Sequence, residues 1–431
     1  MRHDALCLWY LADPATPRCV GRLRLVDTGK GVSLQYGAHW LASGFPLSED
    51  LPLIDIEHLP RWKGLAVGAV DDARPDRWGE RVIQHLDKPA RLSLMEYLFY
   101  AGDDRFGALG VSTSTEAYLP RSQGPLPRLE QAQQLSEIVR KVSDREPVND
   151  IERRLLAAGG SFGGAKPKAL IDIGGEQWII KFFNNEPTDV PLIEHAAMTL
   201  ARLAGIEVAE TRVLALAGEH ALAVRRYDRD GARRIHCISA GTALRAQTVA
   251  GQEPELGYPG LAQLLRRAGV ADDDQNLRDM QQLFRRMVFN ILIDNTEDHE
   301  KNHALMVLAP TRQGRYRLAP AYDVLPTNSG QGYQEFIVGT EQRDSTLANA
   351  MSQCTLFGCT PAQAAAEVMR VIQVVDGWRQ HFAACGVTQA DLDSLAERID
   401  GDALLSQRRG FNPADYAAAV RKPRRRGPFS G

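Results

Sequence analysis

The chain lacks any long hydrophobic run. Its apolar stretches, such as the one at residues 289–293, fall far short of the roughly 18 residues that a membrane span requires. The N-terminus carries Asp4 ahead of a short apolar stretch and has no small-residue cleavage pattern, so no signal peptide is expected. These absences predict a cytoplasmic location with no membrane contact.

Cysteine is sparse, and a strong excess of one charge is missing. The cysteines are scattered without the dense spacing of a disulfide scaffold or paired CxxC knuckles, so reduced thiols are expected. The six are Cys7, Cys19, Cys237, Cys354, Cys359 and Cys385. The formal net charge of −3 gives no global attraction for nucleic-acid phosphates. The basic segment 421–428 is interpreted as a solvated chain end.

Changes in pattern divide the chain. Residues 1–111 alternate apolar and polar positions, which predicts a small β-rich domain with a few helices. Residues 112–128 are rich in Ser, Thr and Pro and are predicted to be a linker. Residues 129–240 form a mixed region with a β-hairpin predicted at 168–183, followed by a helix capped by Thr188 or Asp189 and ended by Gly205. Residues 241–431 are dominated by helical patterns.

A glycine-rich loop and a strand lysine suggest a phosphate site. The loop SFGGAKPK at 161–168 could present backbone N–H groups to phosphate oxygens, since glycines allow close approach. Lys181 is flanked on both sides by apolar residues, and a buried lysine needs an anionic partner. Nucleotide phosphate would be such a partner, and Glu194 on the next helix could hold the ammonium. An edge-strand lysine that reaches solvent is the structural alternative.

The stretch at 294–307 is the most specific. Carboxylates, histidines and amides crowd the step from a helix to a strand there, which is costly without a ligand. Glu297 and Asn302 have the spacing of the catalytic carboxylate and the Mg²⁺-binding Asn in the kinase loop HRDxxxxN. Asp323, between a strand end and a turn, is a suitable second Mg²⁺ ligand, although a lone Asp there is often a turn cap.

Together these stretches resemble the HipA kinase family. The motifs that carry the resemblance run from YGAHWLASGFPLSEDLP, DDARPDRWGERV and GDDRFGAL to SFGGAKPK, WIIKFF, RRYDR, NTEDHEKNHAL and LAPAYDVLPT. The resemblance implies an α+β, protein-kinase-like fold that uses ATP and Mg²⁺. Its parts would be a β-rich N-terminal domain (1–111), a small mixed N-lobe (129–240) and a large all-helical C-lobe (241–431).

The resemblance also implies roles for individual residues. Lys168 and Lys181 would contact ATP phosphates, while Asn302 and Asp323 would hold Mg²⁺. Ser161 occupies the position of a serine that phosphorylates itself. The remaining residues assigned to the nucleotide site are Gly163, Gly164, Ala165, Lys166, Glu194, His299, Lys301 and Tyr322.

One residue departs from the family pattern. The family usually reads NTDDH, with the first Asp as the base, whereas this chain reads NTEDH and places Glu297 there. Glu is one methylene longer and could accept the proton only from a shifted position, which can cost rate steeply. Asp298 could substitute as the catalytic carboxylate.

The family resemblance further implies a growth-inhibiting toxin restrained by a helix-turn-helix antitoxin of the HipB type. DNA would be contacted only through that antitoxin, and an aminoacyl-tRNA synthetase is a candidate protein substrate. Two alternatives remain. The chain could be a nucleotide-binding pseudokinase that acts through its antitoxin, or the HEKNH string at 299–303 could be the HExxH signature of a zinc hydrolase.

Overall fold

The computed structural model describes residues 3–121, 124–157, 166–183, 186–249, 251–311 and 314–417. Residues 161–165 of the predicted phosphate loop, which include the predicted site residues Ser161, Gly163, Gly164 and Ala165, lie outside the described residues, as does the basic segment 421–428. Within the described ranges, no helix has the length and apolar character needed to cross a membrane.

The N-terminal domain is an antiparallel sheet with four short helices, which confirms the predicted β-rich domain. The strand order is β4-β3-β2-β1-β5. The strands are β1 (Ala5–Tyr10), β2 (Arg18–Val26), β3 (Gly31–Tyr36), β4 (Glu57–His58) and β5 (Leu109–Ser112). The helices are α1 (Ala38–Ser43), α2 (Ala69–Asp72), α3 (Arg77–Leu86) and α4 (Leu94–Tyr100).

The second sheet has the order β6-β7-β9-β8 and contains the predicted hairpin. Its strands are β6 (Lys168–Ile173), β7 (Glu176–Phe182), β8 (Thr211–Leu216) and β9 (Glu219–Arg225). Helix α7 (Val190–Leu203) packs on this sheet. The Asp189 side chain accepts the backbone N–H of Leu192, so the predicted cap is confirmed.

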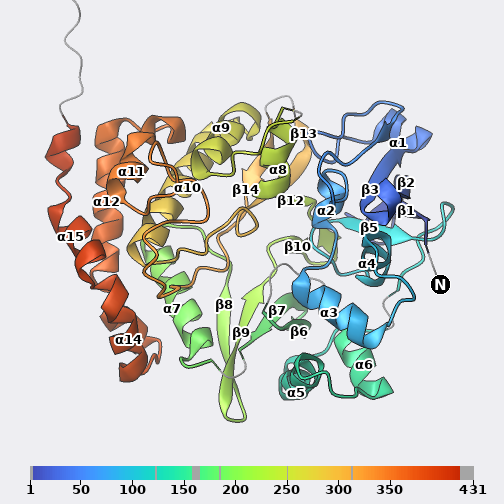
Figure 1. The fold of residues 1–431 in the computed structure, drawn as a ribbon, viewed down its shortest axis with the longest axis horizontal. Helices are drawn as coiled ribbons and strands as arrows, with labels where there is room; N and C mark the ends of the chain where they lie inside the picture. The colour runs from blue at the N-terminus through green and yellow to red at the C-terminus, as the bar shows by residue number, and fades with distance from the viewer. Residues whose placement is uncertain are drawn as a thin grey trace, which may run out of the picture.

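Helix α3 of the N-terminal domain shares a hydrophobic core with the second sheet. Helix α5 (Ala132–Ser143) packs beside β6, and helix α6 (Asp150–Ala157) packs on α5. Trp78 and Val82 of α3 are buried in the same cluster as Leu135 of α5 and Trp178 of β7. In Figure 1, α3 accordingly lies between α4 of its own domain and α5, close to β6 and β7. This packing brings the start of α3 to the edge of the second sheet.

The C-terminal lobe is mainly helical, but it is not all-helical as predicted. It carries a three-stranded sheet in the order β12-β13-β14, with strands β12 (Cys237–Ser239), β13 (Ala304–Thr311) and β14 (Gly314–Leu318). A two-stranded ribbon of β10 (Arg229–Asp230) and β11 (Arg233–Arg234) precedes it. The helices are α8 (Ala240–Gln247), α9 (Tyr258–Ala268), α10 (Gln275–Leu292), α11 (Leu347–Ser352), α12 (Pro361–Val375), α13 (Trp378–Ala384), α14 (Gln389–Ile399) and α15 (Asp402–Gly410).

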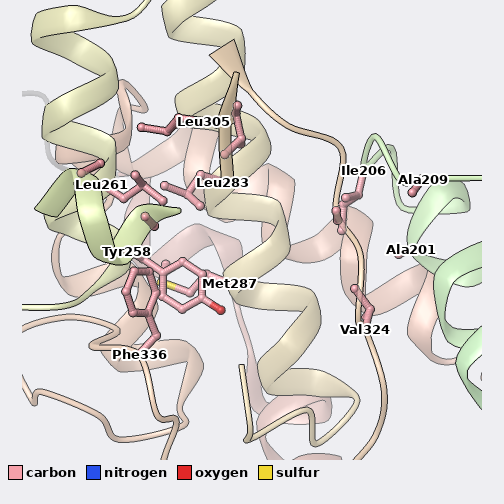
Figure 2. Close-up of a cluster of buried hydrophobic side chains, with 14 of the residues drawn as sticks. Ala201, Ile206, Ala209, Tyr258, Leu261, Leu283, Met287, Leu305, Val324 and Phe336 are labelled. Atoms are coloured by element: carbon pink, nitrogen blue, oxygen red, sulfur yellow. The ribbon is translucent and has the colours of Figure 1, made fainter. Parts of the chain in front are cut away.

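Helix α10 is the centre of this lobe. Leu283 and Met287, on its predicted apolar face, are fully buried. Figure 2 shows them directed toward Leu261 and Tyr258 of α9, with Phe336 below. A helix held on this face is a rigid support, so the polar loop that follows it at 293–303 starts from a fixed point.

Candidate active site

A deep cleft lies where the second sheet, the C-terminal lobe and the N-terminal domain meet. All three parts of the chain contribute side chains to its walls, and clefts between domains are common places for small-molecule and cofactor sites. Its walls include Arg74, Asp76 and Phe106 of the N-terminal domain, Lys168, Ile179, Lys181, Val224 and Tyr227 of the sheet region, and His299, Lys301, Asn302, Tyr322 and Asp323 of the C-terminal lobe.

Lys181 is held at the inner end of the cleft by two carboxylates. Its Nζ lies 2.6 Å from Glu194 Oε1 on α7 and 2.5 Å from Asp323 Oδ1. Glu194 is buried, whereas the side chain of Asp323 is 43% exposed. One carboxylate is therefore a fixed partner of the lysine, and the other faces the cleft, where it is open to a ligand.

The protonation states of this triad follow from their mutual charges. Burial alone would lower the pKa of Lys181, but the charges of Asp323 and Glu194 outweigh it and hold the pKa above its ordinary value. Burial acts to raise the pKa of Asp323, and the Lys181 ammonium overcomes this and lowers it. Asp323 is therefore ionised at neutral pH and can bind a cation.

The backbone at Asp323 is in the left-handed region, with φ of 58°. Such a conformation is uncommon for a residue other than glycine, and Asp tolerates it better than most. The preceding residue, Tyr322, donates its hydroxyl to Lys301 O at 2.8 Å and stacks on Tyr227 at a centroid distance of 5.4 Å. These contacts fix the loop that presents the Asp323 carboxylate to the cleft.

The loop between α10 and β13 brings Asn302 beside Glu297. The Asn302 amide donates to the backbone carbonyl of Glu297 at 3.4 Å, and Asn302 lines the cleft. The Glu297 side chain is exposed and is not among the residues that form the cleft wall. Thr296 Oγ1 lies 2.6 Å from Thr327 Oγ1, so the loop is tied to the segment that follows Asp323.

Asp298 points into the protein interior. Its Oδ2 lies 2.7 Å from His303 Nε2 and accepts the hydroxyl of Tyr258, and Tyr258 in turn accepts from Asn290 of α10 at 3.1 Å. Burial, with the Asp298 charge adding to it, raises the pKa of Tyr258 well above its ordinary value. The tyrosine therefore remains a hydrogen-bond donor that anchors the loop to α9 and α10.

Lys168 faces the cleft from β6 and is paired with the N-terminal domain. Its Nζ lies 3.1 Å from Asp76 Oδ2, with both side chains buried. The Lys168 backbone carbonyl accepts the indole N–H of Trp78 at 2.8 Å. The N-terminal domain therefore contacts this lysine at its side chain and at its main chain.

A buried charge cluster joins the N-terminal domain to the segment after β9. Asp228 accepts from Arg226 at 2.7 Å, from Arg229 at 3.0 Å and from the backbone N–H of Gly107 at 2.8 Å. Burial tends to raise the pKa of Asp228, but the two guanidinium groups hold it well below its ordinary range. Both arginines also donate to the carbonyl of Arg105. The cleft wall at 226–228 is therefore clamped to the N-terminal domain.

Comparison with known proteins assigns the fold to a family. Residues 160–378 match the family described as the HipA-like C-terminal domain, and residues 15–112 match the HipA N-terminal domain. The chain belongs to the HipA family. A solved HipA from Shewanella oneidensis MR-1, described in a complex of HipA, HipB and operator DNA, has the same fold, with a TM-score of 0.66 at 18% identity over 94% of this chain and 97% of that one.

Two curated relatives of this HipA-family chain are named as kinases. One is "Putative kinase Y4dM" of Sinorhizobium fredii, 32% identical over 36% of this chain. The other is "Putative kinase" of Haemophilus influenzae, 24% identical over 46% of this chain. The matched regions span 38% and 61% of those proteins' own length.

The HipA-like C-terminal region brings together most of the predicted site residues. The cleft wall includes Lys168, Lys181, His299, Lys301, Asn302, Tyr322 and Asp323. Glu194 lies behind Lys181 as its ion partner. Lys166 is exposed, pairs with Glu186 and does not line the cleft, and neither Glu297 nor Asp298 contributes to the wall.

Sequence reasoning missed the contribution of the HipA N-terminal domain to the cleft. Arg74, Asp76 and Phe106 belong to the motifs DDARPDRWGERV and GDDRFGAL, which carried the family resemblance but were assigned no site role. Asp76 precedes an amphipathic helix and looks like an ordinary N-cap in the sequence. Its second contact, with Lys168, depends on packing between domains.

The zinc-hydrolase alternative is wrong. HExxH needs a helix so that its two histidines lie one turn apart, but residues 299–303 form turns and loop, and His303 is buried against Asp298. Among the described residues, no group of three or more His, Cys, Asp or Glu side chains is arranged to hold a metal ion.

The side-chain oxygens of Asp323 and Asn302 fit a Mg²⁺ site. Magnesium prefers oxygen ligands, and it is usually bound by one or two protein groups together with substrate phosphates and water. The ionised, partly exposed carboxylate of Asp323 and the amide of Asn302 supply such oxygens in the cleft. Lys181 lies beside Asp323 in the same cleft.

Proposed function

We propose that this HipA-family chain is an ATP- and Mg²⁺-dependent kinase that transfers a phosphoryl group to a serine or threonine hydroxyl of a protein. The observation that carries the proposal is the convergence of Lys181, Glu194 and Asp323, with Lys181 and Asp323 in the cleft wall and Glu194 buried behind the lysine. A lysine held by a helix glutamate and set beside a metal-binding aspartate is the arrangement that protein kinases use for phosphoryl transfer.

In this proposal, each wall of the cleft has one task. Lys168 and Lys181 bind phosphates, and Asn302 and Asp323 would hold Mg²⁺, which neutralises charge on the phosphates. The apolar side chains of Ile179 and Val224, which are cross-strand neighbours on β7 and β9, supply a surface for the base. Catalysis then rests on positioning and on charge stabilisation rather than on covalent chemistry.

Glu297 is the proposed base, and Asp298 anchors the loop that carries it. Both carboxylates were candidates for orienting the attacking hydroxyl. The Asp298 oxygen is engaged by His303 and Tyr258 in the interior, whereas the Glu297 side chain is exposed and can reach an incoming protein. Autophosphorylation at Ser161 remains part of the proposal.

A HipB-type helix-turn-helix antitoxin is the proposed partner, through which any DNA contact would be made. The proposal draws on the fold shared with the HipA of the HipA, HipB and operator DNA complex. An aminoacyl-tRNA synthetase is the proposed first substrate to test, and the proposed biological role is that of a growth-inhibiting toxin.

The test combines calorimetry with labelled ATP. The wild type should bind ATP with Mg²⁺ and transfer label to protein, and Asp323→Asn should lower transfer by about 100-fold or more because the metal-binding charge is lost. Retention of full transfer by Asp323→Asn would overturn the assignment of the metal site. Absence of ATP binding by the wild type would overturn the proposed function.

A pseudokinase is the second candidate, because the exposed Glu297 replaces the family's usual Asp and does not line the cleft. The same assay separates the two functions. Mg²⁺-dependent ATP binding without transfer, to itself or to other proteins, is the result that the pseudokinase predicts.

A further inference from the structure

The two lysines of the cleft are opposite each other in the β6–β7 hairpin. Lys168 and Lys181 are direct cross-strand partners, and like charges in that relationship repel. The repulsion tends to drive the two ammonium groups apart, and buried lysines need anionic partners in any case. Each ammonium therefore requires a carboxylate of its own to stay in the cleft.

The carboxylates come from different parts of the chain. Lys181 has Glu194 and Asp323, both from the HipA-like C-terminal region. Lys168 has Asp76, which lies 92 residues away in the N-terminal domain. The Lys168–Asp76 pair is buried at both ends, with side-chain exposures of 4% and 6%. A buried pair of this kind is screened little by solvent, so its geometry is well defined.

Asp76 is itself held rigidly. Its Oδ1 accepts the backbone N–H of Gly79 at 2.6 Å and so caps α3, which leaves Oδ2 for Lys168. The helix N-terminus offsets part of the Asp76 charge, and this reduces the repulsion that the carboxylate would exert on bound phosphate. Trp78, the second residue of α3, donates its indole N–H to the backbone carbonyl of Lys168.

We infer that Asp76 is a positioning residue through which the N-terminal domain holds Lys168 ready for the phosphates of the nucleotide. This inference rests on the proposed function, because it assumes that Lys168 contacts phosphate. It makes the phosphate end of the cleft a composite of two domains. The N-terminal domain is then part of the nucleotide site.

Asp76→Asn tests the inference because Asn also caps helices well and differs mainly in charge. Calorimetry should show the Kd for ATP rising by about tenfold, the size of effect expected when a charge-assisted hydrogen bond that positions the lysine is lost. The Kd for adenosine, which has no phosphate, should stay within about twofold. Asp189→Asn, at the N-cap of α7, is the matched control and should change neither constant.

A double-mutant cycle with Lys168→Met shows whether Asp76 acts through Lys168. In the Lys168→Met background, Asp76→Asn should have no further effect on ATP binding. Equal weakening of ATP and adenosine binding by Asp76→Asn, or an undiminished effect without Lys168, would show a merely structural role and overturn the inference. If Asp76→Asn does not fold, Asp76→Ser replaces it in every experiment, because Ser also caps helix N-termini well.

The two proposals fail in different ways. If the wild type does not bind ATP, both the proposed function and this inference are wrong. If the wild type and Asp76→Asn bind ATP equally well, only the inference is wrong.

Discussion

Lys181 Nζ lies 2.5 Å from Asp323 Oδ1, although 142 residues separate the two in the chain. The contact joins the second sheet to the C-terminal lobe across the cleft. Because Lys181 also contacts the buried Glu194, the lysine neutralises a carboxylate that solvent does not reach. Its contribution to stability can therefore be measured separately from its proposed contact with phosphate.

Lys181→Met should lower both stability and ATP affinity. The substitution leaves Glu194 buried without its counter-charge, so unfolding by urea should show a loss of about 3 kcal/mol. The Kd for ATP should rise by about 100-fold, because an ammonium on the phosphates is lost. The double variant Lys181→Met/Glu194→Gln should recover most of the stability and none of the ATP binding. Recovery of both would argue against a direct phosphate contact.

Glu297→Gln and Asp298→Asn should affect different properties: the first should lower phosphoryl transfer, and the second should lower stability. Glu297 is exposed, so Glu297→Gln should leave the free energy of unfolding unchanged and lower phosphoryl transfer by about 100-fold, the usual range for a general base. Asp298→Asn disturbs the hydrogen bonds to His303 and Tyr258 and should cost about 2 kcal/mol of stability. Transfer kinetics and urea denaturation measure the two effects.

Glu297→Asp is the control for this pair, since it keeps the charge and restores the residue usual in the family. It should retain transfer well above the Glu297→Gln level. Normal transfer by Glu297→Gln, combined with a stable but inactive Asp298→Asn, would instead identify Asp298 as the base.

Asp228→Asn should weaken the clamp between the N-terminal domain and the cleft. The change removes the charge that Arg226 and Arg229 share in a site where the exposures of Arg226, Arg229 and Asp228 are 1%, 4% and 4%. Urea denaturation should show a loss of about 3 kcal/mol. Asp393→Asn removes a carboxylate that is 61% exposed and pairs with Arg379, and it should change stability by less than about 0.5 kcal/mol. Similar effects of the two variants would show that the cluster contributes little.

His236 should make stability depend on pH in the acid range. Its Nε2 donates to Leu47 O at 3.0 Å, and burial lowers its pKa to about 4. In the unfolded chain the pKa is about 6.5, so between these values only the unfolded state binds the proton. The contribution of His236 to the free energy of unfolding is therefore fully present above pH 6.5. It falls as the pH drops toward 4, by about 3 kcal/mol in total.

His236→Gln, which keeps a donor near Leu47, should remove this part of the pH dependence. Urea denaturation at several pH values between 4 and 7 measures the difference between the two proteins. Parallel pH profiles of stability for wild type and variant would show that the imidazole does not titrate as described.

Local patterns in the sequence determined much of this protein's secondary structure. The period of two predicted the β-rich domain and the hairpin that carries Lys168 and Lys181, and the period of 3.6 predicted the buried face of α10. The resemblance to the HipA family named most of the seven predicted residues that line the cleft. The strands and helices depend on neighbours a few positions apart, so local patterns report them directly.

Only the tertiary structure decided how the polar residues divide their tasks. Glu297 and Asp298 are adjacent in sequence, yet one is exposed and the other is anchored in the interior. The β12–β13–β14 sheet in the C-terminal lobe and the Asp76–Lys168 pair likewise join segments far apart in the chain. The free energy of a buried ion pair depends on which surfaces exclude water around it, and that is set by the packing of whole domains rather than by local sequence.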